Sequence, residues 1–131
     1  MDVATAQRRK VVLAGRITAF LGAFHLVITT AFSMGHLSTW LSGGLWFPAN
    51  GLSDLPPATG AFWLTFGSFG LPLLTLGFLI AWLGGRDVVP PAFVAWALGG
   101  WGTIGALAFE PSPFILIWMP AAVLLAARRR A

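Results

Sequence analysis

Apolar residues are gathered along the chain into four long stretches, separated by polar, glycine-rich or proline-rich segments. The stretches cover residues 11–34, 61–83, 90–109 and 113–127. A helix that crosses the hydrocarbon of a bilayer needs about 20 predominantly apolar residues, and the first three stretches reach that length. The pattern predicts an all-α polytopic membrane protein, in which four transmembrane helices form an antiparallel bundle and residues 1–131 form a single membrane domain.

Local features adjust the ends and the course of these helices. The fourth stretch is short, and Arg128 can extend it, because the stem of an arginine can lie in lipid while its charged head reaches the interface. Pro113 suits the first turn of the fourth helix. Pro72 and Pro120 lie inside apolar stretches, and we expect each of them to kink its helix.

The composition agrees with lipid as the outer solvent. Hydrophobic residues make up 57% of the chain and charged residues only 9%, whereas an ordinary soluble domain has about 25% charged residues. A soluble protein of 131 residues could not cover so much apolar side chain. The preference for Arg over Lys, with abundant Ala and Gly, is typical of a GC-rich bacterial genome, so we expect a protein of the bacterial inner membrane.

The positive charges predict the orientation of the helices. With four crossings, every Lys and Arg falls on one side, which the positive-inside rule makes cytoplasmic. Both termini are therefore expected in the cytoplasm. We expect the tryptophan-rich connection 35–60 to lie on the extracytoplasmic interface or to fold back onto the bundle mouth, with a re-entrant dip as the alternative. The charges that define the cytoplasmic side are Arg8, Arg9, Lys10, Arg16, Arg86, Arg128, Arg129 and Arg130.

Several kinds of chemistry are excluded by the composition. The chain has no cysteine, which excludes disulfides, thiolate chemistry and iron–sulfur clusters. The net charge of +4 does not indicate nucleic-acid binding, because the basic residues lie at the edges of apolar stretches. His25 and His36 lie about 16 Å apart along a helix, so one iron cannot use both, and a haem would have to be shared across a homodimer. We expect no cofactor and no metal.

The first apolar stretch carries a small and polar stripe. Residues seven and eleven apart share a helix face, so Thr18, His25 and His36 line up. Thr29 lies close to them. An ionisable side chain inside a membrane span is a candidate for function. Three interpretations of His25 are open: a neutral, hydrogen-bonded residue that joins helices, a ligand or substrate contact, and a group for proton transfer or metal binding.

Two charged residues complete the candidates. Glu110 is either a solvated loop carboxylate or, with His36 and Asp54, part of a polar cluster at the outer mouth of a central cavity. Arg16 is expected to snorkel to the cytoplasmic interface, with pairing to Asp87 or to an anionic lipid headgroup as the alternative. The candidates for ligand binding are thus His25, Thr29, His36, Glu110 and Arg16, and no residue is assigned a catalytic role.

Short motifs follow one another in a characteristic order. The chain reads Gly15-Arg16 and Gly22-Ala23-Phe24-His25 in the first stretch, Phe62-Trp63 in the second, and Pro111-Ser112-Pro113-Phe114 before the fourth. This order resembles a family of small four-helix bacterial integral membrane proteins known only as a domain of unknown function. Its turn before the fourth helix often reads Pro-x-Ser-Gly-Phe-Trp, so Pro-Ser-Pro-Phe-Ile is a departure. The resemblance implies the four-helix topology and the importance of Arg16 and His25, and no activity.

These observations favour a non-enzymatic helical bundle that acts as an accessory subunit or binds a lipid-like molecule. Its expected partners are membrane lipid and either further copies of the chain or a larger membrane complex. A small transporter or channel is one alternative, although no acidic residue lies inside a predicted span, where proton or cation coupling usually needs one. A membrane enzyme acting on a lipid-soluble substrate is another, with His25, His36 and Glu110 as acid–base groups.

Overall fold

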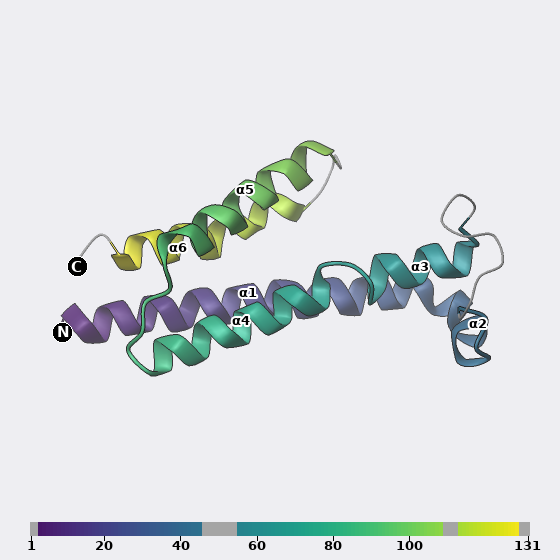
Figure 1. Ribbon diagram of the computed structural model, residues 1–131, viewed down its shortest axis with the longest axis horizontal. Helices are drawn as coiled ribbons and strands as arrows, with labels where there is room; N and C mark the ends of the chain where they lie inside the picture. The colour runs from purple at the N-terminus through teal and green to yellow at the C-terminus, as the bar shows by residue number, and fades with distance from the viewer. Residues whose placement is uncertain (1–2, 46–54, 109–112, 129–131) are drawn as a thin grey trace.

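The computed structural model describes residues 3–45, 55–108 and 113–128, and within these ranges the chain is helical and has no strand. Four helical segments run alternately up and down, so that α1 begins and α6 ends at the same end of the molecule (Figure 1). The predicted all-α class is confirmed for the described residues. The elements are α1 (Val3–Ser33), η1 (Met34–His36), α2 (Leu37–Leu41), α3 (Pro57–Thr65), α4 (Gly70–Gly85), α5 (Ala92–Ala108), η2 (Pro113–Ile117) and α6 (Trp118–Arg128).

The first helix is longer than its apolar stretch. It begins at Val3 and not at residue 11, because Ala, Gln, Arg and Lys ahead of the apolar residues are good helix formers. Arg8, Arg9 and Lys10 are therefore part of α1 itself. Helix α1 continues through η1 into α2, and the indole nitrogen of Trp40 in α2 donates to the carbonyl oxygen of Ala58 at 2.8 Å. The start of the long connection thus folds back onto α3.

Two prolines interrupt helices one turn earlier than we predicted. We expected a kink at Pro72, but the helix breaks over residues 66–69 instead, and Pro72 lies in the first turn of α4. Likewise Pro120 lies in the first turn of α6, directly after the 3₁₀ helix η2. The reason is the same in both places: a proline ring clashes with the carbonyl group four residues earlier, whereas a first-turn position needs no amide hydrogen.

Helices α1 and α4 approach each other along a row of glycines. A Cβ atom on Gly15 would lie 2.7 Å from the carbonyl oxygen of Gly77, and one on Gly22 would lie 2.7 Å from that of Gly70. Any larger side chain would push the backbones apart, so these positions define the crossing. The pattern of small residues in the first two apolar stretches is the sequence signal for this contact.

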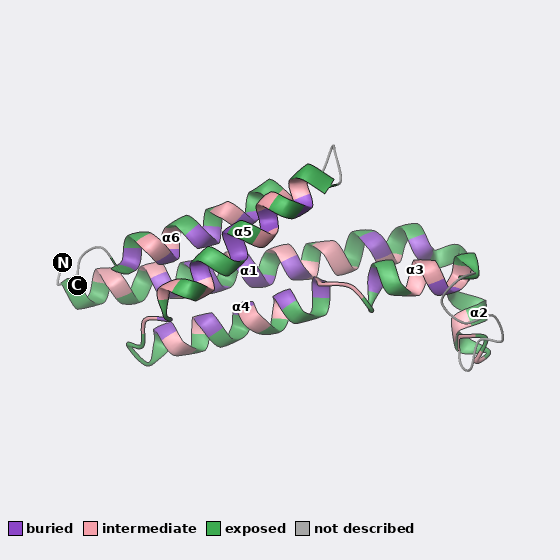
Figure 2. Cartoon of the chain, turned by 45° about the horizontal axis from the view of Figure 1, so that its top comes forward, coloured by how far each residue is buried: buried purple, intermediate pink, exposed green. Residues whose placement is uncertain are grey.

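Helix α6 packs against α1 and α5, and α5 does not pack closely against α4. At Gly99 of α5 the indole ring of Trp118 takes the place that a side chain would fill. The indole nitrogen of Trp118 donates to the hydroxyl of Thr103 at 2.9 Å. As a result α5 and α6 form a hairpin that diverges from α1 and α4 toward the end where α5 stops (Figures 1 and 2).

Much of the apolar surface faces outward. Exposed positions cover the outer faces of all the helices, and buried positions form narrow stripes between them (Figure 2). Two helical stretches, Val3–Leu41 and Pro57–Gly85, are long and apolar enough to cross a membrane. The apolar helices Ala92–Ala108 and Pro113–Arg128 are shorter.

Candidate functional site

The imidazole ring of His25 lies beside the break between α3 and α4. Its Nε2 atom is 3.1 Å from the carbonyl oxygen of Leu64 and 2.9 Å from the hydroxyl of Ser68. The ring also packs on Phe69, with 4.1 Å between the ring centroids. The histidine on α1 is thus attached to the last turn of α3 and to the residues that follow it.

The break explains why a histidine is useful at this position. The last carbonyl groups of a helix lack an amide partner within the helix, and Leu64 is next to the last residue of α3. The Ser68 hydroxyl donates to the Leu64 carbonyl at 2.8 Å, and His25 adds a second donor from another helix. An apolar environment makes an unpaired carbonyl costly, so these two side chains stabilise the break.

The hydrogen-bond partners assign the histidine tautomer. A carbonyl oxygen can only accept, so Nε2 of His25 carries a hydrogen. The Ser68 hydroxyl donates its own hydrogen to the carbonyl oxygen of Leu64. Its oxygen therefore accepts from the same Nε2–H group of His25. Within the described residues Nδ1 has no hydrogen-bond partner, and in the neutral ring it is an acceptor.

Beside this histidine is an apolar cavity of about 170 Å³. Its wall comes from three elements, and His25 is the one polar side chain among the described residues that line it. Elsewhere, a cavity of about 150 Å³ lined by Leu, Ile and Phe stays dry and binds benzene, so this space suits a branch or short stretch of hydrocarbon. The lining residues are Leu21, Phe24, His25 and Ile28 of α1, Phe69 and Leu73 at α4, and Pro113, Phe114, Leu116 and Ile117 of η2.

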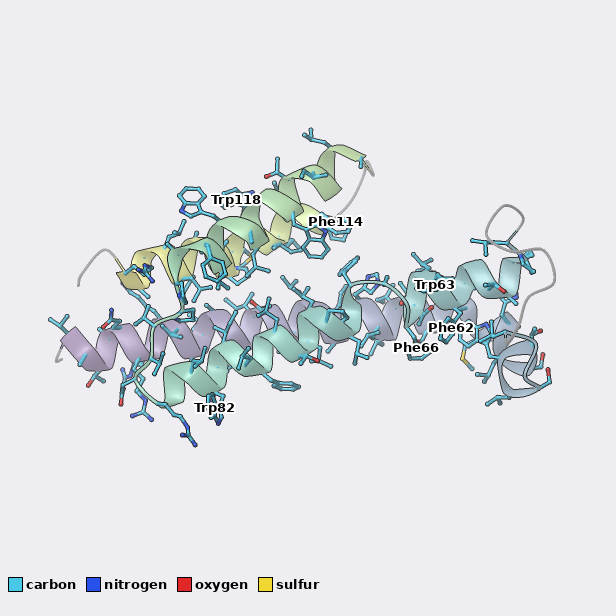
Figure 3. All side chains as sticks on the ribbon, viewed as in Figure 1. Phe62, Trp63, Phe66, Trp82, Phe114 and Trp118 are labelled. Atoms are coloured by element: carbon cyan, nitrogen blue, oxygen red, sulfur yellow. The ribbon has the colours of Figure 1, made fainter. Side chains whose placement is uncertain are left out.

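Aromatic side chains bridge the gap where the hairpin diverges. Phe69 lies 4.9 Å, between ring centroids, from both Trp101 and Phe114. Phe114 extends from η2 on the side of the hairpin that faces α1 and α4 (Figure 3). Phe69 and Leu73 also line a second, wholly apolar hollow of about 240 Å³, which lies against α5. Two apolar spaces therefore share one wall between α4 and the hairpin.

The other candidates take different places. The Thr29 hydroxyl donates to the backbone carbonyl of His25 at 2.7 Å, and its hydrogen bond does not go to the imidazole ring. His36 is half-buried in η1. Glu110 and Asp54 lie outside the described residues, so the polar cluster proposed for them with His36 stays a prediction. Among the described residues, no group of three His, Asp or Glu side chains could hold a metal ion.

Arg16 lies near the start of α1, away from the histidine cavity. It is exposed and lines a hollow of about 320 Å³ together with Arg8, Arg9, Val12 and Leu13. The expected alternative of an Arg16–Asp87 pair is wrong, since Asp87 lies 4.0 Å from the Nε atom of Arg8. Arg16 and His25 are thus placed by different parts of α1.

Sequence reasoning missed three contributors to the histidine site: Ser68, Phe69 and the Leu64 carbonyl. Ser68 had a signal, because it is the residue whose carbonyl group the ring of Pro72 would strike in a continuous helix. A break there frees nearby carbonyl groups for side-chain donors. The Leu64 carbonyl had no signal, since side-chain patterns carry no information on backbone acceptors.

Comparison with known proteins gives a family for almost the whole chain. Residues 9–131 match the family described as Family of unknown function (DUF6463). The resemblance to an uncharacterised domain of unknown function is thereby confirmed. No curated protein and no solved structure matches the chain.

Proposed function

The chain belongs to the Family of unknown function (DUF6463), and we propose that it is a multi-pass membrane protein that binds a lipid-like molecule in the cavity beside His25. The observation that carries this proposal is the cavity itself: an apolar space of about 170 Å³ whose described lining residues include a single polar side chain. Sites for small molecules are commonly apolar with few polar groups, which fix the orientation of the ligand.

The membrane placement is supported by the low burial of the most apolar helices. In the most apolar window of each long helical stretch, only 28% of the residues are buried. The core helix of a soluble protein would be mostly buried there. Large apolar side chains remain exposed instead, among them Phe32 at 84% and Leu107 at 75%. Such surface is stable against lipid and costly in water.

The orientation is supported by contacts that bring basic residues from three helices to one end. Lys10 donates to the carbonyl oxygen of Ala126 at 3.3 Å, and Arg128 donates to that of Pro90 at 2.7 Å. Arg8 lies beside Asp87, which directly follows α4 and Arg86. The start of α1 and the ends of α4 and α6 are therefore level, and the positive-inside rule makes this end cytoplasmic.

The chemistry of the wall favours one class of ligand. A hydrocarbon chain fits the apolar lining, and the lining side chains Phe24 and Leu116 are partly exposed on the outer surface, where lipid would lie. Nδ1 of His25 is the polar side-chain atom left without a partner among the described residues, and it accepts a hydrogen bond in the neutral ring. An ionised headgroup would lose its hydration in this space. The ligand we propose is therefore an amphiphile with a neutral hydroxyl group.

A pair of neighbouring substitutions tests this proposal. Leu116 lines the cavity, whereas Ile115 does not, and both side chains are partly exposed. In Leu116→Trp the indole fills the space, and in Ile115→Trp it points elsewhere. If the indole prevents only two methylene groups of the ligand from being buried in the cavity, at about 0.8 kcal/mol each, the affinity of the protein for that ligand falls by more than about tenfold.

The measurement is mass spectrometry of molecules that co-purify with each variant from native membranes. We expect the same hydroxyl-bearing lipid with the wild type and with Ile115→Trp, and at least about tenfold less with Leu116→Trp. If both variants retained it equally, or if the wild type carried only bulk phospholipid, the proposed function would be wrong.

A further inference from the structure

The ring of Phe69 lies between the cavity beside His25 and the second apolar hollow, and it lines both of them. Apart from Phe69, the hollow of about 240 Å³ is bounded by residues of α4 and α5, whereas the cavity is bounded by residues of α1, α4 and η2. Leu73 is the other residue common to the two linings, and it is buried in the core, with 4% of its surface exposed. The wall between the two spaces is therefore built from Phe69 and Leu73.

The contacts of the Phe69 ring place it on the boundary between these spaces. Its centroid lies 4.9 Å from that of Phe114, which lines the cavity, and 4.9 Å from that of Trp101, which lines the hollow. The ring also packs on the imidazole of His25, at 4.1 Å between centroids. Trp101 and Phe114 are in edge contact with each other, with 5.3 Å between their centroids. Phe69 is thus the member of this aromatic cluster that both spaces touch.

The size of the cavity limits how much hydrocarbon it can enclose. An apolar cavity of about 150 Å³ binds one benzene ring, so the space of about 170 Å³ beside His25 has room for about six carbon atoms of a chain. The cavity reaches the outer surface, because its lining residues Phe24 and Leu116 are 51% and 42% exposed. A longer chain therefore has a way out toward lipid past these side chains, whereas the Phe69 ring separates it from the second hollow.

We propose that Phe69 determines the path of the ligand's hydrocarbon chain. Its ring keeps the chain out of the second hollow, so the protein encloses only the carbon atoms nearest the polar group, and the rest of the chain lies against lipid. This inference rests on the lipid-like ligand given under the proposed function, and it adds the residue that decides how much of that ligand is recognised. The protein then selects an amphiphile by its polar group and the first part of its chain, and not by total chain length.

Photolabelling of the purified full-length protein in mild detergent tests this path. The probes are two primary alcohols, hexanol and dodecanol, each with a diazirine group near the end of its chain, and the labelled residues are mapped by mass spectrometry of peptides. In the wild type we expect hexanol to label cavity residues such as Ile28 or Ile117, and dodecanol to leave the second hollow unlabelled. In Phe69→Ala the dodecanol label should move to Leu76 and Leu98, which line the hollow and do not line the cavity.

Leu76→Trp is the matched control, because Leu76 lines only the second of the two spaces and an indole there fills it. By itself this substitution should leave the hexanol label of the cavity unchanged. Combined with Phe69→Ala, it should remove the dodecanol label from Leu98. An excess of hexanol without a diazirine is a second control: it displaces a chain that enters through the cavity, so the dodecanol label on Leu98 should fall, whereas a chain that enters the hollow directly from detergent is not displaced.

The outcomes separate this inference from the proposed function. If hexanol labels no cavity residue in the wild type, the proposed function is wrong and the inference falls with it. The proposed function stands and the inference is overturned if hexanol labels the cavity but dodecanol already reaches Leu98 in the wild type, does not reach it in Phe69→Ala, or is not displaced there by hexanol. Truncation of a packed ring is destabilising, so circular dichroism checks the fold of each variant. Where Phe69→Ala is unfolded, Phe69→Leu decides: without the ring, the dodecanol label must reach Leu98.

Discussion

The contact between α1 and α4 gives the sharpest prediction of stability, because two alanine substitutions should act in opposite directions. Gly77 faces the backbone of α1, and a methyl group on it would lie 2.6 Å from the Cα atom of Ala19. Gly100 of α5 is exposed, and a methyl group there would meet nothing within 4 Å. Gly77→Ala and Gly100→Ala therefore add the same atom to two different surroundings.

The expected size of the effect follows from these distances. Ordinary contact begins at 3.4 Å, and the amide nitrogen of Ala19 lies closer still than its Cα atom, so α1 and α4 must separate by about an ångström to admit the methyl group on Gly77. A gap of about 0.5–1 Å forfeits a quarter to a half of the dispersion energy of each contact along the interface, and overpacking of this kind costs about 1–3 kcal/mol. Both variants gain up to about 1 kcal/mol from the helix propensity of alanine.

The assay is unfolding of the purified protein in mild detergent by added sodium dodecyl sulfate, followed by far-ultraviolet circular dichroism. The free energy of unfolding should rise slightly in Gly100→Ala and fall in Gly77→Ala. The difference between the two variants, about 1–3 kcal/mol, measures the clash alone, because the propensity gain is common to both. Equal stability of the two variants would refute the close approach of α1 and α4.

Two further predictions concern the break before α4 and the turn after it. His25→Ala and Ser68→Ala should each lower the free energy of unfolding by about 0.6 kcal/mol, because the other side chain still donates to the Leu64 carbonyl. In the double variant the free energy of unfolding should fall by more than the sum of the two single losses, by about 1 kcal/mol or more, because the Leu64 carbonyl is then unpaired. Strictly additive losses would contradict a carbonyl shared by both side chains. Asp87 has a φ angle of 58°, a left-handed backbone conformation that is unfavourable for alanine. In the same assay, Asp87→Ala should lower the free energy of unfolding by about 1 kcal/mol, and Asp87→Gly should lower it less. The reverse order would show that this backbone conformation is not maintained.

The sequence predicts the helical class, and its glycine spacing indicates faces for close packing, both for simple reasons. Long apolar stretches have few stable alternatives to helix, and glycines spaced by seven residues, as at Gly15 and Gly22 or at Gly70 and Gly77, fall on one face of a helix. It does not predict which helices those faces join. It also misses the early start of α1, because the residues before Val11 are polar and stabilise helix by their propensity and not by burial.

The histidine site was harder to predict than the fold, because a backbone carbonyl group, that of Leu64, is one of the hydrogen-bond partners of His25. The sequence left three roles open for His25: a structural hydrogen bond, a ligand contact, and proton transfer or metal binding. The structure supplies the first at Nε2, through a carbonyl group freed by the break before Pro72. It leaves Nδ1 for the second. The same residue therefore joins α1 to α3 and also lines the cavity.

Cysteine accessibility is the most direct test of the membrane account, because the chain has no cysteine of its own. Single variants Ser42→Cys, after α2, and Gly85→Cys, at the end of α4, place one thiol at each end of the molecule on exposed residues. Both are expressed in bacteria and treated with a membrane-impermeant maleimide, after gentle disruption of the outer membrane. We predict that Ser42→Cys is labelled while the inner membrane is intact, and that Gly85→Cys is labelled only after that membrane is opened. Labelling of Gly85→Cys alone before opening, or of neither variant until the cells are lysed, would contradict the proposed orientation.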